Sequence, residues 1–219
     1  MIKIYGVYRS RATRNIWLAN ELGLKFEHIP VIQVYRLPDP HAPGAALHTQ
    51  SPAFLKVNPN GRIPAMVDGD LVLNESLAIN LYLAKKAGGP LAPANLAEDA
   101  RMTAWTLWSV TEVEPHSIQI LYHLVAKPVA ERDPKVAKAA IEALRAPLKV
   151  LDQALAAGGG FVVGRRFTVA DINVAEVVRY ALPATELLAE APNVKAWIAA
   201  CHARPAFKDM MAKRELEPA

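Results

Sequence analysis

Residues 1–31 read MIKIYGVYRSRATRNIWLANELGLKFEHIPV, and this stretch decides the predicted fold. Two strand patterns rich in β-branched and aromatic residues, 2–7 and 26–31, flank a stretch of helical composition at 13–22. The helical stretch stops at Gly23, a residue without Cβ that suits a left-handed helix end. A strand–helix–strand unit favours a right-handed crossover, so we expect the two strands to pair in parallel.

The pattern continues to about residue 86 with a short helix, a hairpin and a final helix. Ser51-Pro52 predicts the short helix, with serine as N-cap and proline at the first helical position. Strand patterns at 63–67 and 71–73 flank Asp68-Gly69-Asp70, which is a hairpin signal, and a helix is expected at 77–86. The predicted order, βαβ-α-ββα, describes a small mixed sheet with helices packed on it.

A glycine- and proline-rich stretch at 88–93 marks a change in composition. Beyond it, alanine, leucine and charged residues at helical spacing dominate, and no convincing strand pattern appears. Pro115 predicts a break in the long helical pattern at 101–124, and another helix is expected at 134–156. The sequence therefore predicts an α+β fold with a sheet-containing domain at 1–86, a linker at 87–96 and an all-α helical bundle at 97–219.

The composition excludes several classes of protein. Of the 219 residues, 52% are hydrophobic, which is enough to bury a core and excludes intrinsic disorder. The 25 basic and 21 acidic residues give a net charge of +4, an excess too small and too evenly spread to indicate nucleic acid. A lone cysteine, Cys201, allows no intramolecular disulfide and no multi-cysteine zinc site. With no visible secretory signal or membrane-length apolar stretch, we expect a soluble, cytoplasmic protein without a metal.

The segment Ser10-Arg11-Ala12-Thr13-Arg14 stands where the first strand pattern meets the first helix. In one interpretation, Ser10 or Thr13 caps the helix by accepting a backbone N–H. In the other, an exposed hydroxyl beside the positive end of the helix dipole donates to a thiolate. Lowering a thiol pKa by about two units needs about 2.7 kcal/mol. One charge-assisted hydrogen bond supplies about 1.5–3 kcal/mol and the dipole about 0.3–1 kcal/mol, so the second interpretation is feasible.

Two further pairs of residues allow a structural and a functional interpretation. Ile63-Pro64 is either an ordinary edge proline or a cis bond that turns the backbone of Ile63 outward, toward a peptide-like ligand. Glu75-Ser76 is either a helix cap or a site for an α-amino acid group. In the second case the Ser76 hydroxyl would hold the ligand carboxylate and Glu75 would face its ammonium group.

A stripe of four residues in the helical half falls at helical spacing on one face: Trp105, Trp108, Glu112 and Pro115. The stripe is either part of the core or the wall of a pocket. Glu112 stands out, because an unpaired carboxylate is costly to bury. Arg9 and Arg11 are its candidate partners, or helpers for an anionic co-substrate.

Four motifs, in this order, resemble those of the cytosolic glutathione transferases: Ile4-Tyr5-Gly6 followed by Ser10-x-Ala12-Thr13-Arg14; Asn58-Pro59-Asn60-Gly61-Arg62-Ile63-Pro64-Ala65; Leu73-Asn74-Glu75-Ser76-x-Ala78-Ile79; and Thr168-x-x-Asp171. The match covers nearly the whole chain, and four ordered motifs are far more specific than any one. The first motif looks most like the serine-using branch, the phi- and theta-like members of bacterial type. The resemblance implies a thioredoxin-like first domain, an all-helical second domain, a homodimer and glutathione as co-substrate.

The resemblance also implies roles for particular residues. Ser10 would activate the glutathione sulfur, with Tyr5 as the runner-up. Ile63, with Pro64 in cis, would pair with the cysteinyl backbone, and Glu75 and Ser76 would hold the γ-glutamyl end. The segment between Gln33 and Ser51 looks longer than the family pattern, and the candidates for the contact to the glycine carboxylate are His48 and Gln50. Arg62 is a further candidate for glutathione binding. The electrophile pocket would lie between the domains and involve Arg9, Arg11, Trp105, Trp108, Glu112 and Pro115.

The function that the resemblance implies is transfer of glutathione, as a thiolate, to a small hydrophobic electrophile, as in detoxification. Glutathione-dependent isomerisation, dehalogenation or peroxidase chemistry would use the same thiolate. A non-catalytic binding or regulatory member of the fold is an alternative from another class, since a fold does not fix a function. Neither nucleic acid nor a membrane is expected as a partner.

Overall fold

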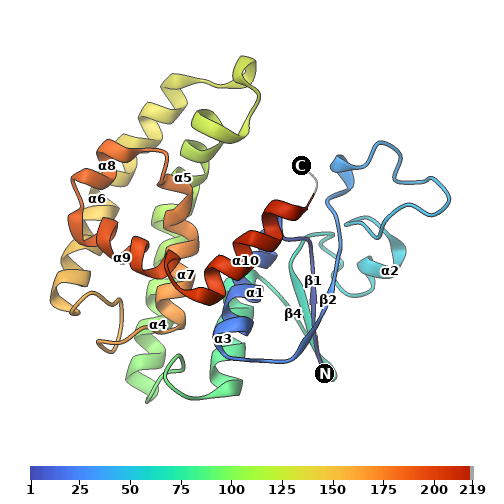
Figure 1. Ribbon diagram of the computed structural model, residues 1–219, viewed down its shortest axis with the longest axis horizontal. Coiled ribbons are helices and arrows are strands. Elements are labelled where there is room, and N and C mark those ends of the chain that lie inside the picture. Colours follow the sequence, from blue (N-terminus) through green and yellow to red (C-terminus); the bar gives the residue numbers. More distant parts are fainter. Residues whose placement is uncertain (218–219) are drawn as a thin grey trace. The chain divides into compact units, whose positions relative to one another are not determined.

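The computed structural model describes residues 1–217, whose helices and strands are drawn in Figure 1. The chain divides into two compact units. Unit 1 comprises Met1–Ala87 together with the segment from Pro205 onward, and unit 2 comprises Gly88–Arg204. The predicted boundaries assigned the segment after residue 204 to the second domain, whereas its contacts lie within unit 1.

Unit 1 is built on a four-stranded mixed sheet with the strand order β2-β1-β3-β4. The strands are β1 (Ile2–Tyr5), β2 (Phe26–Ile29), β3 (Ala65–Asp68) and β4 (Leu71–Asn74). The first pairs in parallel with β2 and antiparallel with β3, and β3 and β4 form an antiparallel hairpin. The predicted strand–helix–strand unit, the hairpin and the thioredoxin-like α+β class are confirmed.

The helices of unit 1 are α1 (Ala12–Glu21), α2 (Pro52–Leu55), α3 (Ser76–Ala87) and α10 (Pro205–Leu216), with a 3₁₀ turn at Val34–Arg36. Helices α1 and α3 pack against each other and against the sheet. Their apolar faces are completely buried there, as Ile16 and Leu83 show. Helix α10 lies along α1 (Figure 1), where the rings of Trp17 and Phe207 meet edge to face at 4.9 Å.

A second, smaller apolar cluster gathers around α2. It is centred on Val31, Phe54 and Ala65, and Tyr5 and Ile63 pack against it. Side chains alternate between the two faces of a strand, so Tyr5 points away from the face that buries Ile2 and Ile4.

Unit 2 consists of helices, and no strand is found between residues 88 and 204. The main helices are α4 (Leu96–Trp108), α5 (Glu114–Leu121), α6 (Pro134–Ala157), α7 (Val169–Val178), α8 (Thr185–Ala189) and α9 (Pro192–His202). Shorter turns are π-helical at Ser109–Val113 and Tyr122–Ala126, and 3₁₀ at Val129–Glu131 and Arg179–Ala181. The all-helical class predicted for this part of the chain is confirmed.

The long helical pattern at 101–124 is broken where proline requires it. Pro115 has no backbone N–H and cannot bond the carbonyl one turn earlier. The preceding residues, Ser109–Val113, widen into a π-helical turn between α4 and α5. The predicted break is therefore confirmed. Pro147, by contrast, lies inside α6 and does not end that helix.

Thr168 and Asp171 form a buried capping box at the start of α7, and several hydrogen bonds meet at the Asp171 carboxylate. The Asp171 carboxylate accepts from the backbone N–H of Thr168 at 2.8 Å and from its hydroxyl at 3.0 Å. It also accepts from the backbone N–H of Val162 at 3.0 Å and from the indole N–H of Trp197 at 2.9 Å. One carboxylate thus joins α7, α9 and the preceding loop.

Candidate functional site

Ser10 lies in the loop that joins β1 to α1, and its hydroxyl is held at the start of the helix. Its Oγ accepts the backbone N–H of Ala12 at 3.1 Å and donates to the carbonyl of Val7 at 2.6 Å. Thr13, the other cap candidate, is buried and donates to the carbonyl of Ser10 at 3.0 Å. Ser10 is only half-buried, so a rotation about its Cβ–Oγ bond could turn the hydroxyl proton toward a bound ligand.

Gly6 is the point where distant parts of the site meet. Its φ of +136° lies in a region that favours glycine. A Cβ at this position would lie 2.9 Å from the Cβ of Ala12, 3.3 Å from the Cβ of Ile63 and 3.5 Å from Ser10 Oγ. The end of β1, the start of α1 and the segment before β3 therefore converge, which brings the first and second sequence motifs together.

Ile63 offers its main chain to this junction. The Ile63–Pro64 bond is cis, and Pro64 is buried. Among the described residues, no hydrogen bond uses the N–H or the carbonyl of Ile63. Asn58 braces the turn just before it by donating to the carbonyl of Arg62 at 2.7 Å, while the Arg62 side chain is exposed. An extended peptide could pair with Ile63 as a strand does.

The third motif lies at the start of α3. Glu75 is exposed and has a φ of +62°, a sparsely populated conformation for a residue with a side chain. Ser76 is buried, and its Oγ accepts from the guanidinium of Arg14 at 3.2 Å. Asn15 donates to the carbonyl of Ser76 at 2.7 Å and to the side chain of Asn80 at 2.8 Å. A buried polar network thus ties the Glu75-Ser76 motif to α1, the helix that follows Ser10.

His48 is buried and is occupied by its own loop. Its Nδ1 accepts the backbone N–H of Gln50 at 3.2 Å, so its Nε2 carries the proton and donates to the carbonyl of Pro40 at 3.1 Å. The backbone N–H of His48 donates to the hydroxyl of Ser51 at 2.9 Å. Ser51 is the N-cap residue of α2 and Pro52 is the first helical residue, as predicted, but the Ser51 hydroxyl makes no capping bond to α2. Gln50, which is exposed, keeps its side chain beside Gly61.

Tyr5, the runner-up to Ser10, is part of the small apolar cluster around α2. Its ring lies 6.1 Å from that of Phe54. Its backbone pairs with Ala65 in the sheet. The Tyr5 ring therefore packs as part of this apolar cluster.

The aromatic stripe of unit 2 differs from the sequence-based expectation. Trp105 and Trp108 are half-buried and meet edge to face, with ring centroids 4.8 Å apart. Glu112 and Pro115 are exposed, so Glu112 needs no buried partner. The π-helical turn at Ser109–Val113 changes the helical register between the two pairs.

Arg9 is paired within unit 1 with a residue that the sequence did not indicate as its partner. Glu217, just beyond α10, accepts the backbone N–H of Tyr8 and the backbone N–H of Arg9, each at 2.8 Å. The Arg9 Nε donates to the carbonyl of Glu217 at 2.8 Å. Burial, and then the charge of Glu217, raise the pKa of the Tyr8 phenol. Arg11 is exposed at the N-cap position, just before α1.

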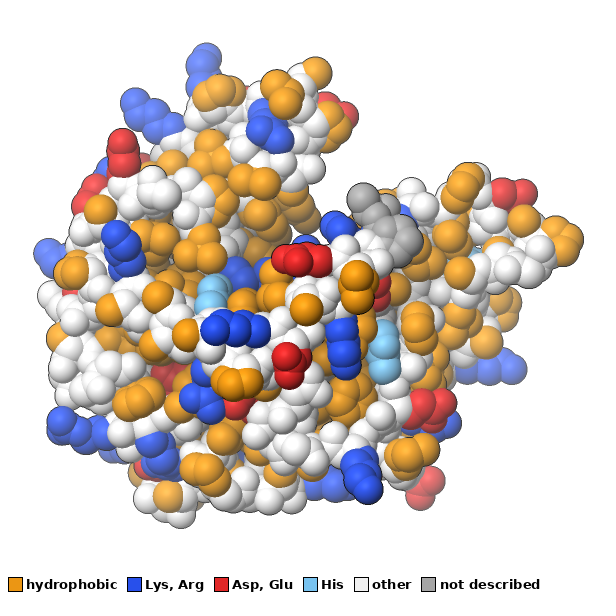
Figure 2. Space-filling model, in the orientation of Figure 1, with side chains coloured by type: hydrophobic (Ala, Val, Ile, Leu, Met, Phe, Trp, Pro, Cys, Tyr) orange, Lys and Arg blue, Asp and Glu red, His pale blue; other side chains and the backbone are white. Residues whose placement is uncertain are grey.

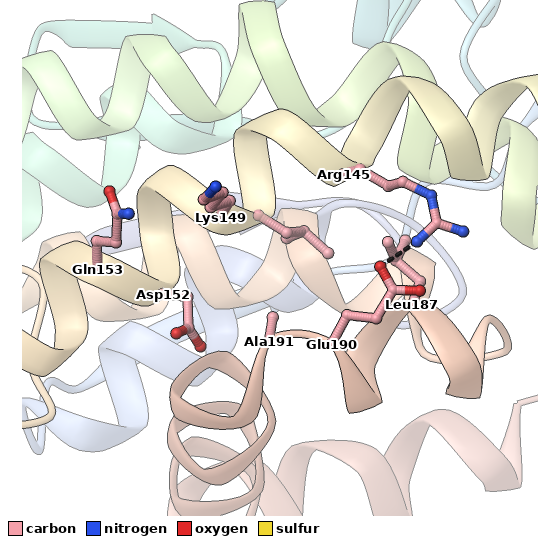
Figure 3. Close-up of a pocket in the computed structure, with 8 residues that line it drawn as sticks. Arg145, Lys149, Asp152, Gln153, Leu187, Glu190 and Ala191 are labelled. Carbon is pink, nitrogen blue, oxygen red and sulfur yellow. Dashed lines mark hydrogen bonds and ion pairs between the residues drawn. The ribbon is translucent and has the colours of Figure 1, made fainter.

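Other features lie away from these residues. Within residues 1–217, no group of three or more His, Cys, Asp and Glu side chains could hold a metal ion, and no helix is long and apolar enough to cross a membrane. Acidic and basic side chains are interspersed on the face shown in Figure 2. The lining of a cavity of about 430 Å³ beside α6 includes Arg145, which pairs with Glu190, and Asp152 (Figure 3). Asp152 accepts two backbone N–H groups at the start of α9.

Comparison with known proteins identifies the family. The sequence profiles of the glutathione S-transferase N-terminal and C-terminal domains match residues 9–86 and 113–205. Glutathione S-transferase 3 of Zea mays is 36% identical over 226 residues, covering 99% of this chain and 96% of that protein. This chain is a glutathione S-transferase family member.

Solved structures of the family agree in fold over the whole chain. Glutathione transferase F7 of Populus trichocarpa superposes with a TM-score of 0.82 at 27% identity, covering 98% of this chain and 99% of that one. Glutathione S-transferase I from maize, solved with an atrazine glutathione conjugate, superposes with a TM-score of 0.82 at 28% identity, covering 99% of both chains.

Within this family member, the sequence motifs found the residues around Gly6 and at the start of α3. They missed Asn15 and Asn80, which support Ser76 from inside the fold. They also missed Glu217, which is separated from its partners by 208 and 209 positions. No local pattern signals a contact over that distance.

Proposed function

We propose that this glutathione S-transferase binds glutathione, stabilises its sulfur as a thiolate with the Ser10 hydroxyl, and transfers it to a small hydrophobic electrophile. The thiolate attacks carbon, an S–C bond forms, and the leaving group departs with the electron pair of the bond that breaks. The observation that carries the proposal is the junction at Gly6, where the Ser10 hydroxyl and the free main chain of Ile63 both lie. Within the family, we assign the chain to the serine-using phi- and theta-like branch.

Thiolate stabilisation needs donors rather than a base, because serine is far too weak a base to remove a thiol proton. Ser10 can rotate its proton from the Val7 carbonyl toward the sulfur, and its Oγ would keep the N–H of Ala12. That retained bond polarises the hydroxyl and makes it a better donor. The N-terminus of α1 adds a positive dipole end at the same place.

The γ-glutamyl end of glutathione fits the start of α3. Because the Ser76 Oγ accepts from Arg14, its own proton remains to donate to a ligand carboxylate. The exposed Glu75 carboxylate complements the ligand ammonium group. The strained backbone of Glu75 is consistent with a binding role, since such conformations cluster at ligand sites.

The glycine carboxylate of glutathione would meet the exposed side chains of Arg62 and Gln50. His48 is a poorer candidate, because both of its ring nitrogens already have partners in the loop. Main-chain pairing with Ile63 would fix the cysteinyl residue between the two ends.

On the electrophile side, the half-buried pair Trp105 and Trp108 offers apolar aromatic surface within unit 2. We further propose that Arg9, Arg11, Glu112 and Pro115 contribute to this side of the reaction. We also propose a cytoplasmic location and a homodimer, as is usual in the family.

The test is a comparison of Ser10→Ala with Tyr5→Phe, using retention on immobilised glutathione and turnover of a chromogenic aryl halide. Loss of one charge-assisted hydrogen bond, worth about 1.5–3 kcal/mol, predicts that Ser10→Ala lowers kcat about 10- to 150-fold. Tyr5→Phe keeps the ring that packs on Phe54 and should keep most of the activity.

Full activity in Ser10→Ala together with an inactive Tyr5→Phe would assign the activating hydroxyl to Tyr5. If the parent protein fails to bind glutathione at millimolar concentration, a binding or regulatory role that does not involve glutathione replaces the enzymatic one.

A further inference from the structure

The loop that carries Ser10 is held by a carboxylate from the opposite end of the chain. Glu217 places one oxygen on the N–H of Tyr8 and the other on the N–H of Arg9, both at 2.8 Å. Its carbonyl accepts from the Arg9 Nε at 2.8 Å, and Arg214 donates to the Tyr8 carbonyl at 3.4 Å. A charged acceptor on two successive amides is a strong and directional contact.

These two amides lie at the position that controls the Ser10 hydroxyl. Tyr8 and Arg9 are the only residues between Val7, whose carbonyl accepts the hydroxyl proton, and Ser10 itself. The backbone torsions of residues 8 and 9 therefore contribute directly to the distance between the Val7 carbonyl and Ser10 Oγ. Holding both amides restricts where the hydroxyl can lie.

The segment that carries Glu217 is itself anchored. Helix α10 packs on α1, with Phe207 against Trp17. Trp17 is fully buried, and α1 is the helix that Ser10 precedes. Glu217 thus reaches the loop from a segment whose helix packs on the same α1.

We propose that Glu217 is a positioning residue for Ser10: by holding the Tyr8 and Arg9 amides, it keeps the Ser10 hydroxyl aimed at the glutathione sulfur. This inference rests on the proposed function of Ser10. It assigns a role in the reaction to a residue that touches neither glutathione nor the electrophile.

The direction in which the pKa of the bound thiol changes, when Glu217 is replaced, distinguishes positioning from an effect of charge alone. A carboxylate that acted only through its charge would oppose a nearby thiolate, so removing it would lower the pKa of the bound thiol. A carboxylate that positions Ser10 has the opposite effect, because its removal weakens the hydrogen bond to the thiolate and raises that pKa.

The experiment is an ultraviolet titration of the thiolate in the glutathione complexes of the parent protein, Glu217→Gln and Glu215→Gln. Glutamine is nearly isosteric with glutamate, but its NH₂ group faces one of the two amides, so the paired contact is lost. Glu215 is exposed on α10, and its substitution removes the same charge without touching the loop.

We expect Glu217→Gln to raise the pKa of the bound thiol by about one unit, which lowers the thiolate fraction about tenfold at pH values below both pKa values. The kcat should fall by the same factor there and recover at higher pH, while KM for the electrophile stays unchanged. Glu215→Gln should behave like the parent protein. A thiol pKa in Glu217→Gln that is unchanged or lower would overturn the proposal.

A double variant separates this inference from the proposed function. If Glu217 acts through Ser10, then Glu217→Gln should change the thiol pKa no further in the Ser10→Ala background. An additive shift would show that Glu217 acts by another route. If the parent has no lowered thiol pKa, or Ser10→Ala does not change it, the role of Ser10 itself fails, and that result is visible without any Glu217 variant.

Discussion

Gly6 shows how one residue sets the geometry of the candidate site. Its position has room for hydrogen only, because a Cβ there would come within 2.9 Å of Ala12 and 3.3 Å of Ile63. The close approach lets Ser10 and Ile63 both lie next to this glycine. A side chain at this point would push the thiolate-stabilising hydroxyl away from the main chain that pairs with glutathione.

We therefore expect Gly6→Ala to lower the free energy of unfolding by about 2–4 kcal/mol, from backbone strain and overpacking together. Retention on immobilised glutathione should fall with it. Gly23→Ala is the matched control, since Gly23 also has a positive φ but nothing lies near its Cβ position. Denaturant unfolding of both variants measures the difference, and equal losses in the two would refute the role of crowding at Gly6.

At this scale, the sequence predicted residues whose motifs are local. Ser10, Ile63 and Glu75 each lie in a short pattern, and the structure brings the first two together. Glu217 could not be found in this way, because it acts through the amides of residues 8 and 9. The Ser51 hydroxyl likewise accepts the backbone N–H of His48 and makes no capping bond to α2. No sequence pattern predicts this contact.

Among the elements, α7 shows most clearly what a cap contributes when it is buried. Asp171 accepts hydrogen bonds from Thr168 at the start of α7, from Trp197 in α9 and from Val162 in the preceding loop. The Thr168-x-x-Asp171 motif forms a capping box, whereas its links to Val162 and Trp197 are tertiary contacts that local spacing does not reveal. The strands of unit 1 were also predicted, although all four end at a different residue from the one predicted, because pairing with neighbours decides where a strand stops.

Asp171→Asn should lower the free energy of unfolding by about 2–4 kcal/mol, because it removes a cap and leaves buried N–H groups facing an NH₂ group. Asp152→Asn makes the same change at the exposed start of α9, where Asp152 accepts from Asn193 and Val194. Water can replace the lost acceptor there, so Asp152→Asn should lower the free energy of unfolding by well under half as much as Asp171→Asn. Thermal unfolding compares the two, and equal effects would contradict the importance of burial.

At the scale of the whole molecule, unit 1 contains all the residues proposed to bind glutathione. It also includes α10, which follows unit 2 in the sequence. The sequence predicted two domains from a change in composition, but composition does not tell on which unit a terminal helix packs. The contact between Trp17 and Phe207 packs α10 on unit 1. This packing brings Glu217 to the loop before Ser10.

We propose above that the Ser10 hydroxyl and the start of α1 keep the glutathione sulfur ionised. Ultraviolet titration of bound glutathione, in the parent protein and in Ser10→Ala, tests this most directly. We expect a thiol pKa about two units below the usual value of about 8.5 in the parent, and a return most of the way to that value in the variant. A parent complex that forms thiolate only at strongly alkaline pH, or a variant with the same low pKa, would contradict it.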